Sequence, residues 1–173
     1  MLLYSKNIYF PNQIKREGYL ELEDGIIKNF YKELPQGADY KDYSDYHVIP
    51  GFIDQHLHGW GTGSYNNDPS GKAVRTMKEQ LPSVGVTSFL ATSGATTLDD
   101  VYEGIKSTGE ILNTQKPGDG ATCLGVHLEG PFVNEKRAGM MNVSCFLEPS
   151  VEVMQSFIDA QVSPRTIKLM TMA

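Results

Sequence analysis

The sequence lacks the features that place a protein across or outside a membrane. Only two cysteines, Cys123 and Cys145, occur in 173 residues, and no Cys-x-x-Cys pair is present, which excludes a sulfur-ligated zinc site. No apolar run approaches the roughly 20 residues of a membrane helix. Residues 1–10 also lack the basic and long apolar regions of a signal peptide. We therefore expect two free thiols and a cytoplasmic protein without membrane contact.

Basic residues are too few to predict a nucleic-acid partner. The chain has 15 Lys and Arg against 21 Asp and Glu, a formal charge of −6 at pH 7, whereas nucleic-acid-binding domains usually carry a basic face. No run of like charge reaches five residues, which excludes a polyelectrolyte tail. The hydrophobic share of 40% is ordinary for a globular protein. A small molecule is the expected partner.

Residues 1–46 are predicted to form a small β-layer. The pair Asp24-Gly25 separates two strand-like runs, and such a pair is a strong hairpin signal because glycine tolerates the positive φ of the turn. The polar segment 34–44 is predicted to be a loop. The strands expected here span residues 2–10, 19–22 and 26–31.

Residues 47–173 are predicted to alternate between strands and helices. Such alternation is typical of parallel β/α units with right-handed crossovers, which gives an α/β fold class. A closed (β/α)₈ barrel typically needs about 250 residues, so this part is expected to be the first half of a barrel, with about four strands. The expected strands span 47–58, interrupted early by Pro50-Gly51, then 86–92, 122–129 and 167–172. The expected helices span 69–84, 98–112 and 149–160.

The motif Pro-Gly-Phe-Ile-Asp-Gln-His-Leu-His-Gly ends the first of these strands. Side chains alternate between the faces of a strand, so His56 and His58 are expected on one face, with Asp54 beside them to support the two rings. Two imidazoles at a strand's carboxyl end chelate a divalent metal well. The glycine-rich turn that follows strengthens this interpretation against a chance pair of histidines, and His56 and His58 are predicted to be metal ligands.

A second motif, His-Leu-Glu-Gly-Pro-Phe, ends the strand 122–129. A carboxylate that leaves water is costly unless it is paired or bound to a metal, so Glu129 is predicted to be a further metal ligand. For His127 two roles stay open: a group that contacts the substrate or supports the ligands, and a packed core histidine.

Together the two motifs resemble the N-acetylglucosamine-6-phosphate deacetylases of the amidohydrolase superfamily, and the likeness extends along the whole chain. The resemblance implies a TIM-type (β/α)₈ barrel with a small β-sandwich, of which residues 1–46 would be the N-terminal part and 47–173 the first part of the metal-dependent barrel. It implies hydrolysis of the acetamide of N-acetylglucosamine 6-phosphate to glucosamine 6-phosphate and acetate, in amino-sugar catabolism. It also implies one or two divalent ions, with zinc or iron expected, and a homodimer at full length.

The resemblance assigns roles to residues of this chain. Glu129 matches the ligand of the main catalytic metal, and His56 and His58 match the pair that holds a second ion in some members. Residues Gly139-Met140-Met141-Asn142 match a sugar-contacting Gly-x-His-Asn stretch, so Met140, Met141, Asn142 and His127 are the expected substrate-binding residues. Met141 replaces the usual histidine, which leaves room for a related N-acetylated sugar phosphate. The family takes two more histidines and a catalytic aspartate from later strands, so the 173 residues alone are expected to be inactive, with no catalytic acid or base of their own.

Three other interpretations remain open. The first is another amidohydrolase, dihydroorotase-like or dihydropyrimidinase-like, in which a carboxylated lysine of the fourth strand bridges the metals; Lys168 lies on that strand. The second is an inactive metal-binding or interaction module. The third, which we favour, is that the chain is part of a longer enzyme.

Overall fold

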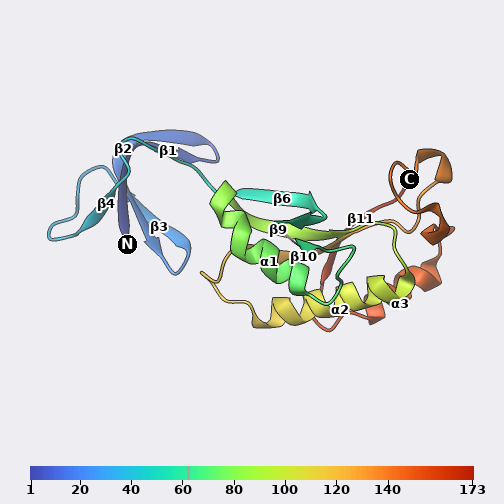
Figure 1. Cartoon of the computed structure of the whole chain (residues 1–173). Helices are drawn as coiled ribbons and strands as arrows, with labels where there is room; N and C mark the ends of the chain where they lie inside the picture. The colour runs from blue at the N-terminus through green and yellow to red at the C-terminus, as the bar shows by residue number, and fades with distance from the viewer. Residues whose placement is uncertain (62) are drawn as a thin grey trace. The chain divides into compact units, whose positions relative to one another are not determined.

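A computed structural model describes residues 1–61 and 63–173, and it divides into two compact units, Met1–Gly51 and Phe52–Ala173 (Figure 1). Each unit has its own sheet and its own hydrophobic core. The sequence placed the boundary before His47. In the structure it follows Gly51, because His47 and Val48 pair with the first strand of the first unit.

The first unit is a five-stranded sheet. Its central strand β1 (Leu2–Phe10) pairs antiparallel with β2 (Gln13–Glu23), which pairs antiparallel with β3 (Ile26–Tyr31). Two short strands, β4 (Tyr40–Asp42) and β5 (His47–Val48), both run parallel to β1.

The turn between β2 and β3 confirms the predicted hairpin. Asp24 and Gly25 both have a positive φ, of 50° and 76°, as a tight two-residue hairpin turn requires. The prediction of a loop over residues 34–44 was wrong in part, because residues 40–42 form β4. No hydrophobic alternation marks this segment, and only its pairing with β1 makes it a strand.

The second unit is an α/β structure with a parallel sheet. Its strands lie in the order β11-β10-β9-β6, so each strand neighbours the next one along the chain, and all three pairings are parallel. The three helices lie along one face of this sheet (Figure 1). The sheet consists of β6 (Phe52–Leu57), β9 (Val86–Ser93), β10 (Thr122–Glu129) and β11 (Ile167–Thr171); the helices are α1 (Lys72–Gln80), α2 (Leu98–Thr114) and α3 (Val151–Asp159); and β7 (Gly59–Trp60) pairs with β8 (Gly63–Ser64) after β6.

The strand expected from His47 to His58 is interrupted at Pro50-Gly51 as predicted, but its two parts, β5 and β6, belong to different units. The helix expected from Pro69 begins only at Lys72, because Gly71 takes a left-handed φ of 86° at its N-terminus. By contrast, α2 begins as predicted, with the Thr97 hydroxyl accepting a hydrogen bond from the Asp100 amide.

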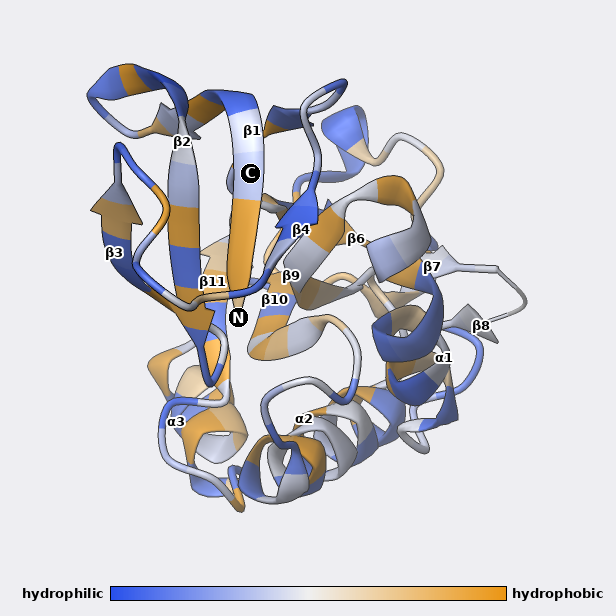
Figure 2. Cartoon of the chain, turned by 90° about the vertical axis from the view of Figure 1, so that its left-hand side faces the viewer, coloured by the Kyte–Doolittle hydropathy of each residue, from blue (hydrophilic) through white to orange (hydrophobic). Residues whose placement is uncertain are grey.

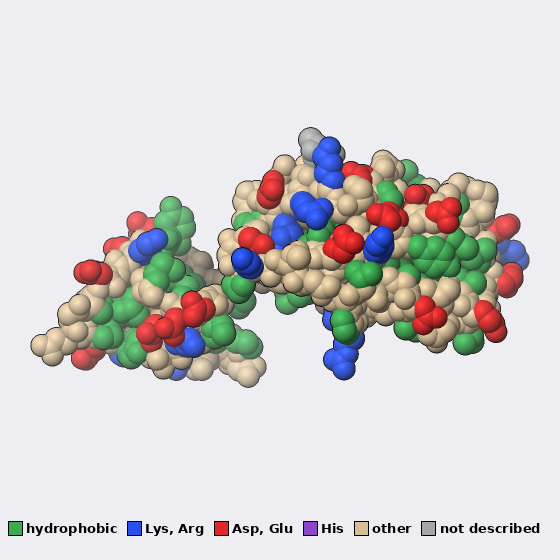
Figure 3. Space-filling model, turned by 90° about the horizontal axis from the view of Figure 1, so that it is seen from below, with side chains coloured by type: hydrophobic (Ala, Val, Ile, Leu, Met, Phe, Trp, Pro, Cys, Tyr) green, Lys and Arg blue, Asp and Glu red, His purple; other side chains and the backbone are tan. Residues whose placement is uncertain are grey.

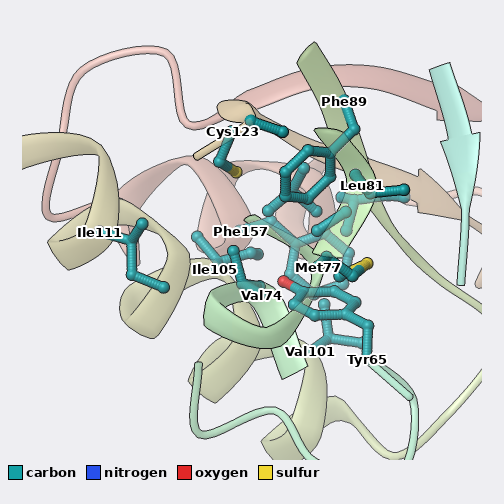
Figure 4. Packing of buried hydrophobic residues seen from close by; sticks show 14 residues of the cluster. Tyr65, Val74, Met77, Leu81, Phe89, Val101, Ile105, Ile111, Cys123 and Phe157 are labelled. Atoms are coloured by element: carbon teal, nitrogen blue, oxygen red, sulfur yellow. The ribbon is translucent and has the colours of Figure 1, made fainter. Parts of the chain in front are cut away.

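The core of the second unit lies between the sheet and the helices. Phe89 on β9 and Phe157 on α3 are both fully buried there, together with Val74 and Met77 of α1 (Figure 4). The remaining outer surface of α1 is mostly hydrophilic (Figure 2). This one-sided pattern places the helices on one face of the sheet and leaves the other face to the polar residues described below.

The surface carries both signs of charge. On the face drawn in Figure 3, acidic and basic side chains are interspersed rather than gathered into patches of one sign. In the described part of the chain, none of the helices is long and apolar enough to cross a membrane.

Candidate metal centre

Three side chains converge at the carboxyl ends of two strands. His56 lies near the end of β6, His58 follows that strand, and Glu129 is the last residue of β10. The Nε2 atoms of the two histidines are 3.1 Å apart, and Glu129 Oε2 lies 3.2 Å from His58 Nε2 and 3.7 Å from His56 Nε2. Among the described residues, this is the one group of three or more His, Cys, Asp or Glu whose ligand atoms come this close together.

The spacing of these atoms suits a metal ion. Two ligand atoms about 2.0–2.1 Å from a tetrahedral ion lie roughly 3.3 Å apart, and the three observed separations bracket that value. Two imidazole nitrogens and a carboxylate oxygen are donors that zinc and iron both accept. The residues present therefore fit a divalent ion.

A hydrogen bond at Nδ1 of His58 leaves its Nε2 available to bind a metal ion. Nδ1 of His58 is 3.1 Å from the Thr92 carbonyl oxygen. Since a carbonyl oxygen only accepts, Nδ1 must carry the hydrogen, and in the neutral ring Nε2 then keeps its lone pair for a ligand bond.

A bulge in β6, between Asp54 and Leu57, places Asp54 and His56 on opposite faces of the sheet. Asp54 pairs with Phe89 and Leu57 pairs with Ala91, so three steps on β6 match two steps on β9. Phe89 and Ala91 belong to the core beneath the helices, so Asp54 is on the side of the sheet away from His56. The prediction that Asp54 would share their face was therefore wrong; it supports them instead through the backbone, accepting a hydrogen bond from the His56 amide at 3.0 Å.

His127 is buried beneath the cluster, with 2% of its surface exposed. Its Nδ1 lies 3.0 Å from the Gln55 carbonyl oxygen and its Nε2 lies 2.8 Å from the Thr171 hydroxyl. Burial lowers the pKa of His127, while the hydrogen bond to Gln55 raises it by less, so the ring is held in its neutral form. Both nitrogens of His127 are engaged by the protein, and of its expected roles this geometry favours support of the ligands.

A hollow of about 710 Å³ opens beside the cluster. His58 and Glu129 lie in its wall, and so do Met140, Met141 and Asn142, the expected substrate-binding residues. The Asn142 side-chain oxygen accepts hydrogen bonds from the amide and hydroxyl of Ser144, so the amide nitrogen is the group that Asn142 can offer to a ligand.

Two other candidates lie apart from the centre. Lys168 is exposed on β11, and its side chain lies near Gly125, in the first half of β10, whereas Glu129 ends that strand. It is therefore not placed to bridge metals at the strand ends. The two cysteines are free, and burial raises the pKa of Cys123 to about 11, so its thiol is a packing group.

Sequence reasoning missed two residues of the centre, Thr92 and Thr171. Both are polar residues near the carboxyl ends of parallel strands, where functional side chains of α/β folds gather. That position was the available signal, but which face they use depends on the register of the sheet.

Comparison with known proteins finds sequence relatives along the whole chain, although no family model matches. An N-acetylglucosamine-6-phosphate deacetylase of Bacillus subtilis is 32% identical over 177 aligned residues, which cover 100% of this chain and 44% of the relative. An N-acetylgalactosamine-6-phosphate deacetylase of Escherichia coli is 26% identical over 92% of this chain and 42% of the relative. The chain thus spans less than half the length of these relatives.

A solved structure supports the same relationship. The crystal structure of N-acetylglucosamine-6-phosphate deacetylase from Pasteurella multocida superposes with a TM-score of 0.81 at 25% identity, over 92% of this chain and 42% of that one.

Proposed function

Because this chain belongs with the N-acetylglucosamine-6-phosphate deacetylases over its whole length, we propose that it supplies part of the active site of a metal-dependent amide hydrolase. The proposed reaction removes the acetyl group of N-acetylglucosamine 6-phosphate and yields glucosamine 6-phosphate and acetate. The observation that carries the proposal is the convergence of His56, His58 and Glu129 on one point.

The arrangement of the second unit supports a barrel. Its four parallel strands follow one another in chain order, and the three helices lie on one face (Figure 1). A doubly wound sheet would carry helices on both faces, whereas a (β/α)₈ barrel keeps them all outside. We therefore assign residues 52–173 to the first part of such a barrel and residues 1–51 to a small β-sandwich. The metal centre then lies at the carboxyl ends of the strands, where barrel active sites are found.

The residues of this chain would hold the ion and orient the substrate. Glu129, His56 and His58 would bind one or two divalent ions, with zinc or iron the best suited. When bound, such an ion polarises an amide carbonyl and lowers the pKa of a water ligand. Water adds to the acetyl carbon, the carbon–nitrogen bond breaks, and the sugar amine leaves after gaining a proton. The aspartate that moves this proton would belong to the part of the relatives that this chain does not span.

The hollow beside the ion would take the sugar. Met141 and Asn142 lie in its wall together with Glu129, which places a bound sugar against the metal. A thioether forms only weak hydrogen bonds. Met141 would therefore distinguish only weakly between the two configurations of a sugar hydroxyl beside it. A related sugar such as N-acetylgalactosamine 6-phosphate, on which an E. coli relative is named to act, is the alternative substrate.

The position of Lys168 argues against a dihydroorotase-like or dihydropyrimidinase-like enzyme, because that lysine lies away from the centre. We further propose that the intact protein is cytoplasmic and, as the family resemblance implies, a homodimer.

Release of acetate from N-acetylglucosamine 6-phosphate by the intact, metal-loaded protein tests the proposed function. We expect turnover by the wild type and a loss of at least 100-fold in Glu129→Gln, because an amide is a much poorer metal ligand than a carboxylate. Glu135→Gln, at an exposed glutamate of the following loop, is the matched control and should retain full activity. If neither this substrate nor its galactose epimer is hydrolysed by the wild type, the deacetylase assignment is wrong.

A further inference from the structure

Three side chains hold the peptide groups of the bulge that presents His56. The Gln55 carbonyl accepts a hydrogen bond from His127 at 3.0 Å, and the Leu57 amide donates to the Thr92 hydroxyl at 2.8 Å. Between them, the His56 amide donates to Asp54. In a regular parallel strand such groups pair with the neighbouring backbone, but a bulge disrupts that ladder. Side chains therefore replace the lost backbone partners at three consecutive residues.

Thr92 connects this bulge to the ring of His58. Its side chain is fully buried on β9, and its hydroxyl binds the backbone between the two histidines. Its carbonyl oxygen, in turn, accepts the hydrogen bond from His58 Nδ1. One residue therefore fixes both the path of the backbone and the orientation of a ligand ring.

His127 holds the bulge from the other side. It pairs with Thr92 in the register of β9 and β10, yet its Nδ1 reaches the Gln55 carbonyl on β6, one strand further away. Its Nε2 is anchored by Thr171 on β11. A single buried ring thus connects the strand that carries Glu129 with the strand that carries His56 and with β11.

We propose that Thr92 and His127 are positioning residues. They hold His56 and His58 so that both rings lie next to the Glu129 carboxylate. The proposal rests on the metal site of the proposed function. Neither residue offers an atom to the ion. Without the hydroxyl of Thr92 or the Nδ1 donor of His127, a peptide group of the bulge loses its partner, and the two histidine rings lose their fixed separation.

Zinc affinity of the intact protein, measured by competition with a chelator, tests the role of Thr92. Thr92→Val keeps the shape of the side chain but removes the hydroxyl, and we expect zinc to bind roughly 10- to 100-fold more weakly, as for other groups that orient metal ligands. Thr92→Ser keeps the hydroxyl and should bind within about threefold of the wild type. Thr108→Val is the matched control, because Thr108 is equally buried but its hydroxyl bonds Tyr65, among the core residues beneath the helices; its affinity should not change.

A second pair of variants keeps the test decisive if Thr92→Val fails to fold. His127→Asn retains an N–H near the position of Nδ1, whereas His127→Leu does not, so zinc affinity should fall much further in the leucine variant. Equal zinc affinity in Thr92→Val and wild type, or in the two His127 variants, would overturn the positioning role alone. A wild type that binds no zinc would instead overturn the proposed metal site, and the positioning role with it.

Discussion

At the scale of single residues, the centre depends on which nitrogen of each ring is free. His58 donates from Nδ1 to Thr92 and keeps Nε2 for a ligand bond, whereas both nitrogens of His127 are engaged. Glu129 is largely withdrawn from solvent, with 22% of its side chain exposed, and a bound cation would offset the cost of that position. His58 and His127 both lie near the carboxyl ends of parallel strands, but their hydrogen-bond partners give them different roles.

We propose that Met141, which lines the hollow, sets how strongly the site discriminates between configurations of a sugar hydroxyl. Since a thioether makes only weak hydrogen bonds, we expect kcat/KM of the intact protein for the glucose and galactose epimers of the N-acetylated 6-phosphates to differ by less than about tenfold. A site built to hydrogen-bond a hydroxyl discriminates by far more, so Met141→His should widen the difference. Ile158→Ala is the control, because Ile158 is exposed on α3 and lies outside the lining of the hollow, so it should leave the ratio unchanged. An unchanged ratio in Met141→His would contradict this role.

The sequence predicted the meeting of His56, His58 and Glu129, although it gave an incomplete reason for it. Alternation along a strand places His56 and His58 on one face, but the same rule also placed Asp54 there, and the bulge moves it to the other side. A bulge depends on contacts with β9, which no local pattern of β6 reveals. Thr92 and Thr171 were missed for the same reason, because the register decides which strand residues face the centre.

At the scale of elements, local patterns worked best where hydrophobic periodicity and end signals agreed. The expected helix 98–112 begins where predicted because Thr97 caps it, and the expected strand 122–129 matches β10 at both ends. The helix expected from Pro69 began three residues late, since the left-handed Gly71 prevents helical geometry before Lys72. The short strand β4 could not be predicted, because only its pairing with β1 makes it a strand.

Phe157 packs α3 against the rest of the second unit. Its ring is fully buried in the core (Figure 4). The ring centre lies 5.5 Å from that of Tyr102 on α2. Phe157→Ala leaves a cavity as well as losing buried apolar surface, and we expect the free energy of unfolding to fall by about 3–5 kcal/mol. Denaturant titration measures this loss, with Val151→Ala, at an exposed position of the same helix, as the control. A loss below 1 kcal/mol would show that α3 does not pack as described.

Asp119 connects the segment before β10 to α1 through its hydrogen bond with Lys78. Its carboxylate accepts hydrogen bonds from the Lys116 amide and from the buried Lys78 ammonium, and these lower its pKa in the folded state. A carboxyl whose folded pKa is lowered stabilises the fold above its unfolded pKa of about 4. That contribution is lost as the pH falls through the folded pKa.

Thermal unfolding as a function of pH checks this prediction for Asp119. Asp119→Asn should lower the melting temperature at pH 7, and the gap to the wild type should narrow below pH 4. Asp99→Asn, at an exposed aspartate of α2, is the control for loss of one charge. A gap that stays constant down to pH 2 would show that the carboxylate is not held by these partners.

At the scale of the whole molecule, the four-stranded sheet of the second unit has one apolar face and one polar face. The face toward the helices is a continuous apolar core, while the other face carries His56, Thr92 and His127. The sequence predicted the α/β class from alternating elements, and its resemblance to the deacetylases is matched by the relatives. Closure of the sheet into a barrel remains our proposal, because closure depends on contacts between strands far apart in a chain and not on any local pattern.

We propose that His56, His58 and Glu129 bind the metal that the reaction uses. Anomalous X-ray diffraction from crystals of the intact, metal-loaded protein tests it most directly, because the signal locates the ion and identifies its element. We expect an anomalous peak about 2.0–2.2 Å from Nε2 of His56, Nε2 of His58 and a carboxylate oxygen of Glu129. A bound ion that contacts none of these three side chains would contradict the account.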